Sequence, residues 1–373
     1  MLRPIRLILT AILLLAGPHL LAEPMHDETL HITKAGLLFD VTLSAQLYTP
    51  PGTGPFPLIV INHGKQPGNA ALQKDQAYYF QAKQFVERGY AVLVPTREGF
   101  GSSGGTYQEV KCDQTRTGEL QAVDITLSIN AIRTRPEIDS HHIVVIGQSA
   151  GGLATMALAE QLPAGVVGLI DMAGGIRNEK CPQWSQGVVA AFARYGSQAT
   201  VPVLMMYGEN DSFWGPGLDL PQAIFNAYRQ GDGQTTFVDT GVFKKDSHRV
   251  FPDPEGMAIW GPAFQTFFSQ LHLPFDIKYR LGSADAGAVD VDEVAAVPTT
   301  STVCKSLYLS RFLATAPKQH RAFALSDNGR CGYATGGSVS ERALEYCQAA
   351  NGENCKLYAV DDQVVWPSAP QAH

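Results

Sequence analysis

Short apolar runs alternate with helix-length segments along residues 30–275. Five of the runs are continuous, which is typical of strands buried on both faces of a parallel sheet. The alternation predicts an α/β fold, with helices on both faces of a mostly parallel, doubly wound sheet. The runs are residues 58–61, 90–94, 143–146, 166–170 and 203–206, and the helical segments are residues 73–88, 117–133, 151–161, 220–229 and 255–271.

Two further segments complete the predicted sheet. Residues 37–48 alternate between apolar and polar side chains, which indicates an opening antiparallel strand or hairpin. Residues 235–238 read Thr-Thr-Phe-Val and are expected to form the last strand, because β-branched and aromatic side chains favour strands.

The composition changes after the last helical segment. Residues 281–303 are rich in Ala, Gly, Asp and Thr, which predicts a linker. Residues 304–373 then form a small C-terminal α+β module, with expected strands at 323–325 and 357–360 and a helix at 340–349. So small a unit needs covalent staples to be stable, and four cysteines are available in it.

Six cysteines favour disulfides if the chain is exported. The simplest pairing joins Cys112 to Cys181, which leaves two bridges within the last quarter of the chain. Metal ligation is the alternative, although no CxxC or Cys/His pair has the spacing of a zinc site. The sequence does not choose among the three pairings of the remaining cysteines, Cys304, Cys331, Cys347 and Cys355.

The N-terminus predicts export. Arg3 and Arg6 precede an apolar run over residues 7–16, and Ala22 is a small residue suited to cleavage, so residues 1–22 are expected to be a signal peptide. A membrane anchor is the alternative, but about ten apolar residues are too few to span a bilayer. Cleavage would change the formal charge from 28 − 35 = −7 to 26 − 35 = −9. This acidic balance argues against nucleic acid as a partner.

Residues 147–151 read Gly-Gln-Ser-Ala-Gly, between an apolar run and a small-residue helical segment. This is the Gly-x-Ser-x-Gly pattern of a nucleophile elbow, the sharp strand-to-helix turn that exposes a serine hydroxyl. Glycines are needed two residues before and two residues after the serine, because the backbone passes too close there for larger side chains. Ser149 is therefore the candidate nucleophile, and a plain glycine-rich turn is the alternative.

A serine hydroxyl needs a base to take its proton and an acid to orient that base. Asp211 follows the strand two beyond the elbow and is the candidate acid, with Glu209 and then Asp171 as competitors. His248 is the candidate base. It follows the last strand and is the one histidine between Asp211 and the closing helical segment.

The reaction also needs two backbone N–H groups to hold the developing oxyanion. The first is expected from Ala150, directly after the nucleophile. The second is expected from the loop that follows residues 58–61, where Lys65 is the candidate donor. His63 is then expected to pack that loop and not to act as a second base.

Aromatic residues stand on several loops at the carboxyl edge of the predicted sheet, where a ligand should bind. They are candidate substrate contacts, and packing of the loops is the alternative. These residues are Phe100, Tyr107, Phe213 and Trp214.

Six motifs follow one another from residue 62 to residue 248: residues 62–64, 97–105, Asp139, residues 147–152, 207–211 and 247–248. As a set they resemble the dienelactone hydrolase-like branch of the α/β-hydrolase superfamily, and they are also similar to catalytic domains of the prolyl oligopeptidase type. The resemblance implies an α/β-hydrolase domain over residues 23–280 and a triad of Ser149, Asp211 and His248.

The sequence as a whole predicts an exported serine hydrolase, periplasmic or secreted, without a stable membrane anchor after signal cleavage. We expect it to act on small-molecule carboxylic esters through an acyl-enzyme, with no metal or organic cofactor. A peptidase or amidase with the same triad is the second interpretation. The third is a hydrolase-like scaffold whose tail module binds a cell-surface ligand, which an intact triad disfavours.

Overall fold

The computed structural model describes residues 25–36, 39–229, 234–279, 281, 297–315, 320–336, 339–361 and 363–364. The expected signal peptide, residues 1–22, lies outside the described residues, as do residues 282–296 of the expected linker. Within the described ranges, no helix has both the length and the apolar character needed to cross a membrane.

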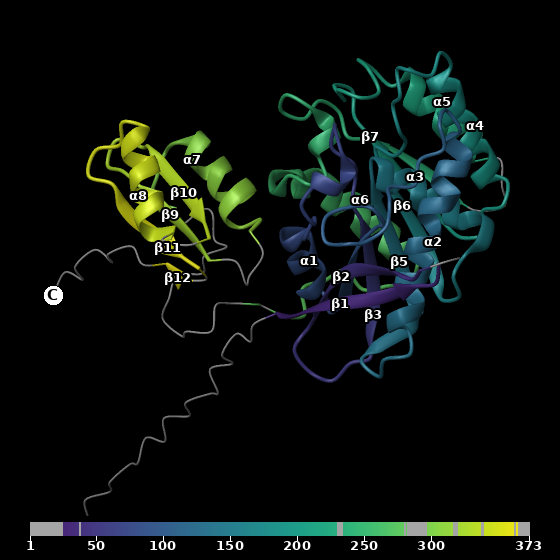
Figure 1. The fold of residues 1–373 in the computed structure, drawn as a ribbon, viewed down its shortest axis with the longest axis horizontal. Coiled ribbons are helices and arrows are strands. Elements are labelled where there is room, and N and C mark those ends of the chain that lie inside the picture. The colour runs from purple at the N-terminus through teal and green to yellow at the C-terminus, as the bar shows by residue number, and fades with distance from the viewer. Residues whose placement is uncertain are drawn as a thin grey trace, which may run out of the picture.

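An eight-stranded sheet forms the centre of the larger unit (Figure 1). Its strand order is β1-β2-β4-β3-β5-β6-β7-β8. The pairs β1/β2 and β2/β4 are antiparallel, and the other neighbouring strands are parallel. The strands are β1 (His26–Lys34), β2 (Val41–Thr49), β3 (Phe56–Asn62), β4 (Ala91–Thr96), β5 (Ile138–Gln148), β6 (Val166–Met172), β7 (Val203–Tyr207) and β8 (Thr235–Asp239).

The apolar runs correspond to the buried parallel strands, as predicted. Successive residues of β3 show why such a strand is apolar throughout. Leu58 and Val60 belong to the core on one face of the sheet, whereas Ile59 and Ile61 belong to the core on the other face. The predicted opening strand is also confirmed, as β2, and it forms an antiparallel pair with β1.

Helices cover both faces of the sheet (Figure 1). One face packs against α2 (Gln114–Ile132), α3 (Ala150–Ala157), α4 (Trp184–Gly196) and α5 (Asp219–Tyr228), and the other against α1 (Tyr79–Val86) and α6 (Met257–Gln270). Short turns lie between them: η1 (Ala70–Leu72), η2 (Leu158–Gln161), η3 (Ser247–Arg249) and η4 (Pro254–Gly256). The predicted doubly wound α/β architecture is therefore confirmed. Helix α4 is not among the predicted segments, and α1 begins six residues later than predicted.

The C-terminal region forms a second sheet with its own core (Figure 1). Its antiparallel order is β10-β9-β11-β12, with bounds β9 (Arg321–Leu325), β10 (Cys331–Thr335), β11 (Lys356–Val360) and β12 (Gln363–Val364). Ala322 and Ala324 pack under α8 (Val339–Ala349) on one face. Phe323 and Leu325 pack on the other face, against α7 (Thr302–Leu307) and η6 (Tyr308–Phe312). The predicted strands and helix of the small α+β module are present.

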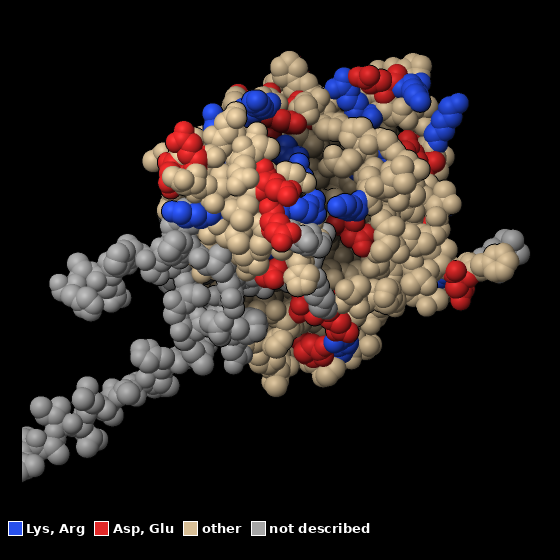
Figure 2. Space-filling view, turned by 60° about the vertical axis from the view of Figure 1, so that its left-hand side comes forward, with Lys and Arg blue, Asp and Glu red and all other residues tan. Residues whose placement is uncertain are grey.

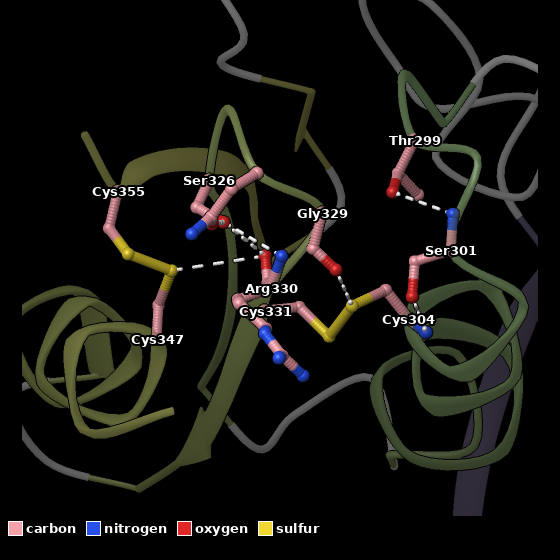
Figure 3. Close-up of a disulfide and its surroundings, with 10 residues drawn as sticks. Thr299, Ser301, Cys304, Ser326, Gly329, Arg330, Cys331, Cys347 and Cys355 are labelled. Atoms are coloured by element: carbon pink, nitrogen blue, oxygen red, sulfur yellow. Dashed lines mark hydrogen bonds between the residues drawn. A yellow bond between two sulfur atoms is a disulfide. The ribbon is translucent and has the colours of Figure 1, made fainter. Parts of the chain in front are cut away.

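All six cysteines form disulfides, so none of them is a free thiol that could bind a metal. The predicted bridge Cys112–Cys181 is confirmed. The two bridges of the tail, whose pairing the sequence left open, are Cys304–Cys331 and Cys347–Cys355. They lie on opposite sides of the turn before β10 (Figure 3), so they tie both helical layers to the small sheet.

The surface carries charges of both signs. On the face drawn in Figure 2, Lys and Arg side chains lie close to Asp and Glu side chains, with wide neutral areas between the groups. This face offers mixed charges and not a broad basic surface of the kind that follows a phosphate backbone.

Candidate active site

Ser149 lies on a sharp turn between β5 and α3, as predicted for the elbow. Its backbone has φ 56° and ψ −122°, a conformation that residues with a side chain rarely adopt. Two hydrogen bonds stabilise the turn: the Ser149 N–H donates to the Met172 carbonyl, and the Ser149 carbonyl accepts from the Gly175 N–H, each at 3.0 Å. The strain thus persists because neighbouring segments hold the backbone on both sides.

The two motif glycines are required by close backbone approach. A Cβ at Gly147 would lie 2.2 Å from the Gly151 carbonyl oxygen. A Cβ at Gly151 would lie 2.3 Å from the Asn62 carbonyl oxygen. Both distances are far below van der Waals contact, which confirms the steric reason given for the pattern.

Asp211 and His248 form a buried pair. His248 Nδ1 lies 2.9 Å from Asp211 Oδ2, and the Asp211 side chain is fully buried. The other carboxylate oxygen, Oδ1, accepts from the N–H groups of Phe213 at 2.8 Å and Trp214 at 3.3 Å. Because the carboxylate accepts a hydrogen bond from Nδ1–H, the imidazole presents Nε2 as an acceptor for a serine hydroxyl.

The competing acids lie elsewhere. Glu209 is exposed, and no described contact joins its side chain to His248. Asp171, at the end of β6, is completely buried and accepts a 2.7 Å hydrogen bond from the Tyr207 hydroxyl. Of the three candidates, Asp211 alone contacts the imidazole.

His63 holds the loop that follows β3. The Arg97 N–H donates to His63 Nε2 at 3.2 Å, so the ring proton is on Nδ1, which donates to the Gly64 carbonyl at 2.7 Å. Complete burial, together with the nearby Arg97 guanidinium, lowers the pKa of His63 well below its usual range. His63 is therefore a neutral residue of the loop, as the sequence analysis expected.

The two predicted oxyanion donors lie on adjoining segments. A Cβ at Gly64 would lie 3.1 Å from Ser149 Cβ, so the loop that carries Lys65 passes directly beside the nucleophile. Among the described residues, neither the Lys65 N–H nor the Ala150 N–H donates to a protein acceptor. Ala150 is the first residue of α3, where the helix dipole also favours negative charge.

A pocket of about 290 Å³ opens over these groups. Ser149, His248 and Lys65 line it, as do two of the four predicted substrate contacts, Phe100 and Phe213. The Phe213 ring lies 4.3 Å from the His248 ring, measured between centroids. Phe213 therefore covers one face of the imidazole while it lines the pocket.

The other two predicted substrate contacts do not line the pocket. Tyr107 packs behind Phe100, with ring centroids 5.1 Å apart. Trp214 is buried, and its indole N–H donates to the Ala173 carbonyl at 3.1 Å. Tyr107 and Trp214 therefore pack the loops, which is the alternative that the sequence left open for these aromatic residues.

Several pocket residues were not anticipated from the sequence. Gln148 precedes the nucleophile, and Asp246 lies two residues before His248. Six residues between Gln66 and Tyr78 contribute to one wall, and the φ of 46° at Tyr78 allows the chain to turn into α1. A signal was available for Asp246, because an aspartate two residues before a buried turn residue is a common capping arrangement.

Comparison with known proteins finds a family model that matches part of the chain. The family model of X-Pro dipeptidyl-peptidases (S15 family) matches residues 40–201. Among curated proteins, none matches this sequence.

Similar solved structures include an esterase and a peptidase. The esterase Pf2001 of Pyrococcus furiosus is 16% identical, with a TM-score of 0.47, over 66% of this chain and 90% of that chain. The acylaminoacyl peptidase of Pyrococcus horikoshii is 17% identical, with a TM-score of 0.48, over 69% of this chain and 44% of that chain.

The strand order, the helical layers and the serine elbow define an α/β-hydrolase fold.

Proposed function

We propose that the protein is an exported carboxylic ester hydrolase with a catalytic triad of Ser149, His248 and Asp211. The observation that carries this proposal is the arrangement of the pocket. A strained serine at a nucleophile elbow shares it with an imidazole whose Nδ1 is bonded to a buried carboxylate.

In the first half of the proposed reaction, Ser149 Oγ attacks the ester carbonyl carbon and its proton passes to His248 Nε2. The carbonyl π electrons move to the oxygen, and the N–H groups of Lys65 and Ala150 bind the resulting oxyanion. Collapse of the tetrahedral intermediate breaks the bond to the alcohol oxygen, which takes the proton from His248. The alcohol leaves, and an ester of Ser149 remains.

In the second half, a water molecule attacks this acyl-enzyme and its proton passes to His248 Nε2. The second tetrahedral intermediate collapses with loss of Ser149 Oγ, which takes the proton back. Asp211 remains ionised throughout and stabilises the imidazolium formed in each half.

The pocket favours small and polar esters. Its volume of about 290 Å³ is at the lower end of the range for small-molecule sites. Besides Phe100 and Phe213, its wall includes the amide side chains of Gln66, Gln73 and Gln76. A small ester that carries both apolar and polar groups suits this lining.

A peptidase or amidase is the second candidate, because the matching family model is that of a peptidase family. Both reactions use the same triad and differ in the leaving group. Parallel assays on a short-chain ester, a long-chain ester and a peptide panel separate them. Faster turnover of peptides would replace the esterase proposal.

Export is supported by the leader-like residues 1–22 and by the three disulfides, which persist in oxidising compartments. N-terminal sequencing of the mature protein from a periplasmic or culture fraction tests it. A mature chain that begins near Glu23 is expected.

Replacement of the nucleophile is the direct test of the proposed chemistry. We predict that Ser149→Ala lowers turnover of p-nitrophenyl acetate by about 10⁴-fold or more while the protein stays folded. The matched control is Ser197→Ala, which removes the hydroxyl of an exposed serine after α4. Near-normal turnover in Ser149→Ala, or an unchanged reaction with a fluorophosphonate label, would refute the assignment.

A further inference from the structure

His248 is not carried by a long element. It lies in η3, a single 3-10 turn of three residues, between the loop after β8 and the turn η4. A turn of this length does not fix its own position, yet the proposed proton transfer requires the imidazole to come within hydrogen-bond reach of Ser149 while it contacts Asp211. Contacts from neighbouring segments must therefore fix the position of the His248 imidazole.

We propose that Asp246 is a positioning residue that sets the distance between the loop carrying Asp211 and the turn carrying His248. The proposal rests on the triad proposed above and adds to it a residue that touches neither the substrate carbonyl nor the transferred proton.

The Asp246 carboxylate accepts three hydrogen bonds from the two segments. Its Oδ1 accepts from the His248 N–H and from the Ser212 N–H, each at 3.0 Å. Its Oδ2 accepts from the Ser212 hydroxyl at 2.7 Å. Because Ser212 directly follows Asp211, a single side chain joins the backbone of the proposed base to the backbone beside the proposed acid.

A second set of contacts closes the same junction from the other side of Asp211. The Asn210 side chain accepts from the Phe243 N–H at 3.0 Å and donates to the Lys244 carbonyl at 3.2 Å. A Cβ at Gly208 would lie 2.4 Å from Ser247 Cβ, so a larger residue would push the two loops apart. Together with the contacts of Asn210 and Gly208, the hydrogen bonds of Asp246 therefore join the loop of Asp211 to residues 243–248 on both sides of Asp211.

The elbow is tied to the same turn. Gln148 Nε2 donates to the His248 carbonyl at 3.3 Å. A Cβ at Gly64 would lie 2.4 Å from Gln148 Oε1, so the amide fills the space between the elbow and the loop of Lys65. The His248 backbone is therefore held at its N–H by Asp246 and at its carbonyl by Gln148.

The charge of Asp246 suits this role. Partial burial acts to raise its pKa, but the hydrogen bonds from Ser212 and His248 outweigh that effect and lower the pKa below its usual value. The carboxylate thus stays ionised and accepts all three bonds over the pH range in which a histidine base works. The titratable or charged groups that share the pocket with it are Lys65, Lys74, His248 and Arg249, and Asp211 lies behind His248.

The test compares Asp246→Ala and Asp246→Asn with a matched control, Asp253→Ala. Asp253 also caps a 3-10 turn, accepting from the Glu255 N–H at 3.0 Å, but it does not line the pocket or contact the loop of Asp211. Two experiments are made on the full-length protein. One measures kcat and KM on a short-chain ester, and the other follows the downfield proton resonance of the His248 Nδ1–H bonded to Asp211.

A positioning role predicts a split between the two kinetic constants. We expect Asp246→Ala to lower kcat by about 10- to 100-fold, since an error of about 1 Å in a reacting group costs this much, with KM within about twofold. Asp246→Asn keeps an oxygen that can accept both N–H bonds, so it should recover most of the loss. The downfield resonance should broaden or shift in Asp246→Ala and stay unchanged in Asp253→Ala.

Two results would overturn the proposal. One is kinetic constants and a downfield resonance in Asp246→Ala and Asp246→Asn that match those of Asp253→Ala. The other is a fall in kcat that follows only the folded fraction, measured by circular dichroism, with the resonance unmoved. The resonance can be measured without turnover. If the wild type shows neither esterase activity nor labelling of Ser149, the proposed function is refuted, and the resonance still tests whether Asp246 positions His248.

Discussion

Asp211 and Glu209 lie two residues apart on one loop but in opposite surroundings. The Asp211 side chain is fully buried and accepts from His248, whereas Glu209 is exposed. We predict that Asp211→Asn lowers kcat on a short-chain ester by about 10⁴-fold, because asparagine cannot stabilise the imidazolium and favours the wrong tautomer. Glu209→Gln is the matched control and should retain turnover. A larger loss in Glu209→Gln would mean that the acid is misassigned.

Asp171 is a second buried carboxyl group, next to the elbow but outside the proposed chemistry. The Tyr207 hydroxyl lies 2.7 Å from Asp171 Oδ2 and 3.0 Å from the Gly174 carbonyl oxygen. Its single proton is shared between these two acceptors. Complete burial outweighs the hydrogen bond from Tyr207, which acts to lower the pKa of Asp171, and raises that pKa to about 7.

This raised pKa predicts a pH-dependent contribution to stability. Between about pH 4 and pH 7 the unfolded state releases a proton that the folded state keeps, so stability falls as pH rises and levels off above pH 7. Asp171→Asn removes the titration. Its free energy of unfolding relative to wild type should therefore rise across this window by up to about 4 kcal/mol. Urea unfolding at several pH values measures the difference, and a pH-independent difference would contradict the assignment.

Helices α2 and α4 are joined near their first turns by the disulfide Cys112–Cys181. Asp113, which caps α2, follows Cys112 directly. The Gln114 side chain adds a 2.9 Å hydrogen bond to the Ile176 carbonyl. The bridge therefore ties together two loops that leave the sheet at its carboxyl edge.

We predict that Cys112→Ser combined with Cys181→Ser destabilises the larger unit by about 4 kcal/mol, from the entropy of a closed loop of this length. The bridged residues are 69 positions apart in sequence. Differential scanning calorimetry measures the effect. The control is the pair Cys347→Ser and Cys355→Ser, whose bridge spans 8 positions in the tail and should leave the main transition unmoved. Equal effects on that transition would contradict the separation.

How far the elements could be predicted depends on how they are buried. A strand covered on both faces is apolar at every position, so residues 58–61 were evident as a strand. Helix α4 was missed although Val188, Ala191, Phe192 and Tyr195 have helical spacing. Its start carries no cap signal, because Gln183 makes no side-chain cap bond, and Gly187 weakens its first turn.

The candidate site divides in the same way. Ser149, Asp211 and His248 could be predicted because Ser149 lies in a recognisable motif after β5, and the other two lie in the loops that follow β7 and β8. The contacts that Gln148 and Asp246 make across loops could not, because they join segments distant in sequence, as do the bonds from Gln148 to His248 and from Ser212 to Asp246. The burial of Trp214 likewise depends on Ala173, which the sequence does not place beside it.

At the scale of the whole molecule, the hydrophobic cores divide the chain. Among the described residues, the two cores that flank the large sheet end with Leu281. The two cores of the small sheet begin with Val297. Residues 282–296, which lie between them, are outside the described residues. This division supports the expectation that the tail is a separate module with its own staples.

We therefore predict that the chain truncated after residue 286 stays folded and keeps its kcat on a small ester. Leu281, the last member of the main cores, is retained, and no described tail residue lines the pocket or belongs to the proposed triad. The comparison is made with the full chain, by turnover of p-nitrophenyl acetate and by size-exclusion chromatography. Binding to a large or surface-bound substrate should weaken if the tail recognises it. If the tail instead covers the site as a lid, truncation would change turnover of the small ester several-fold, and exposed apolar surface would drive the shortened chain to aggregate.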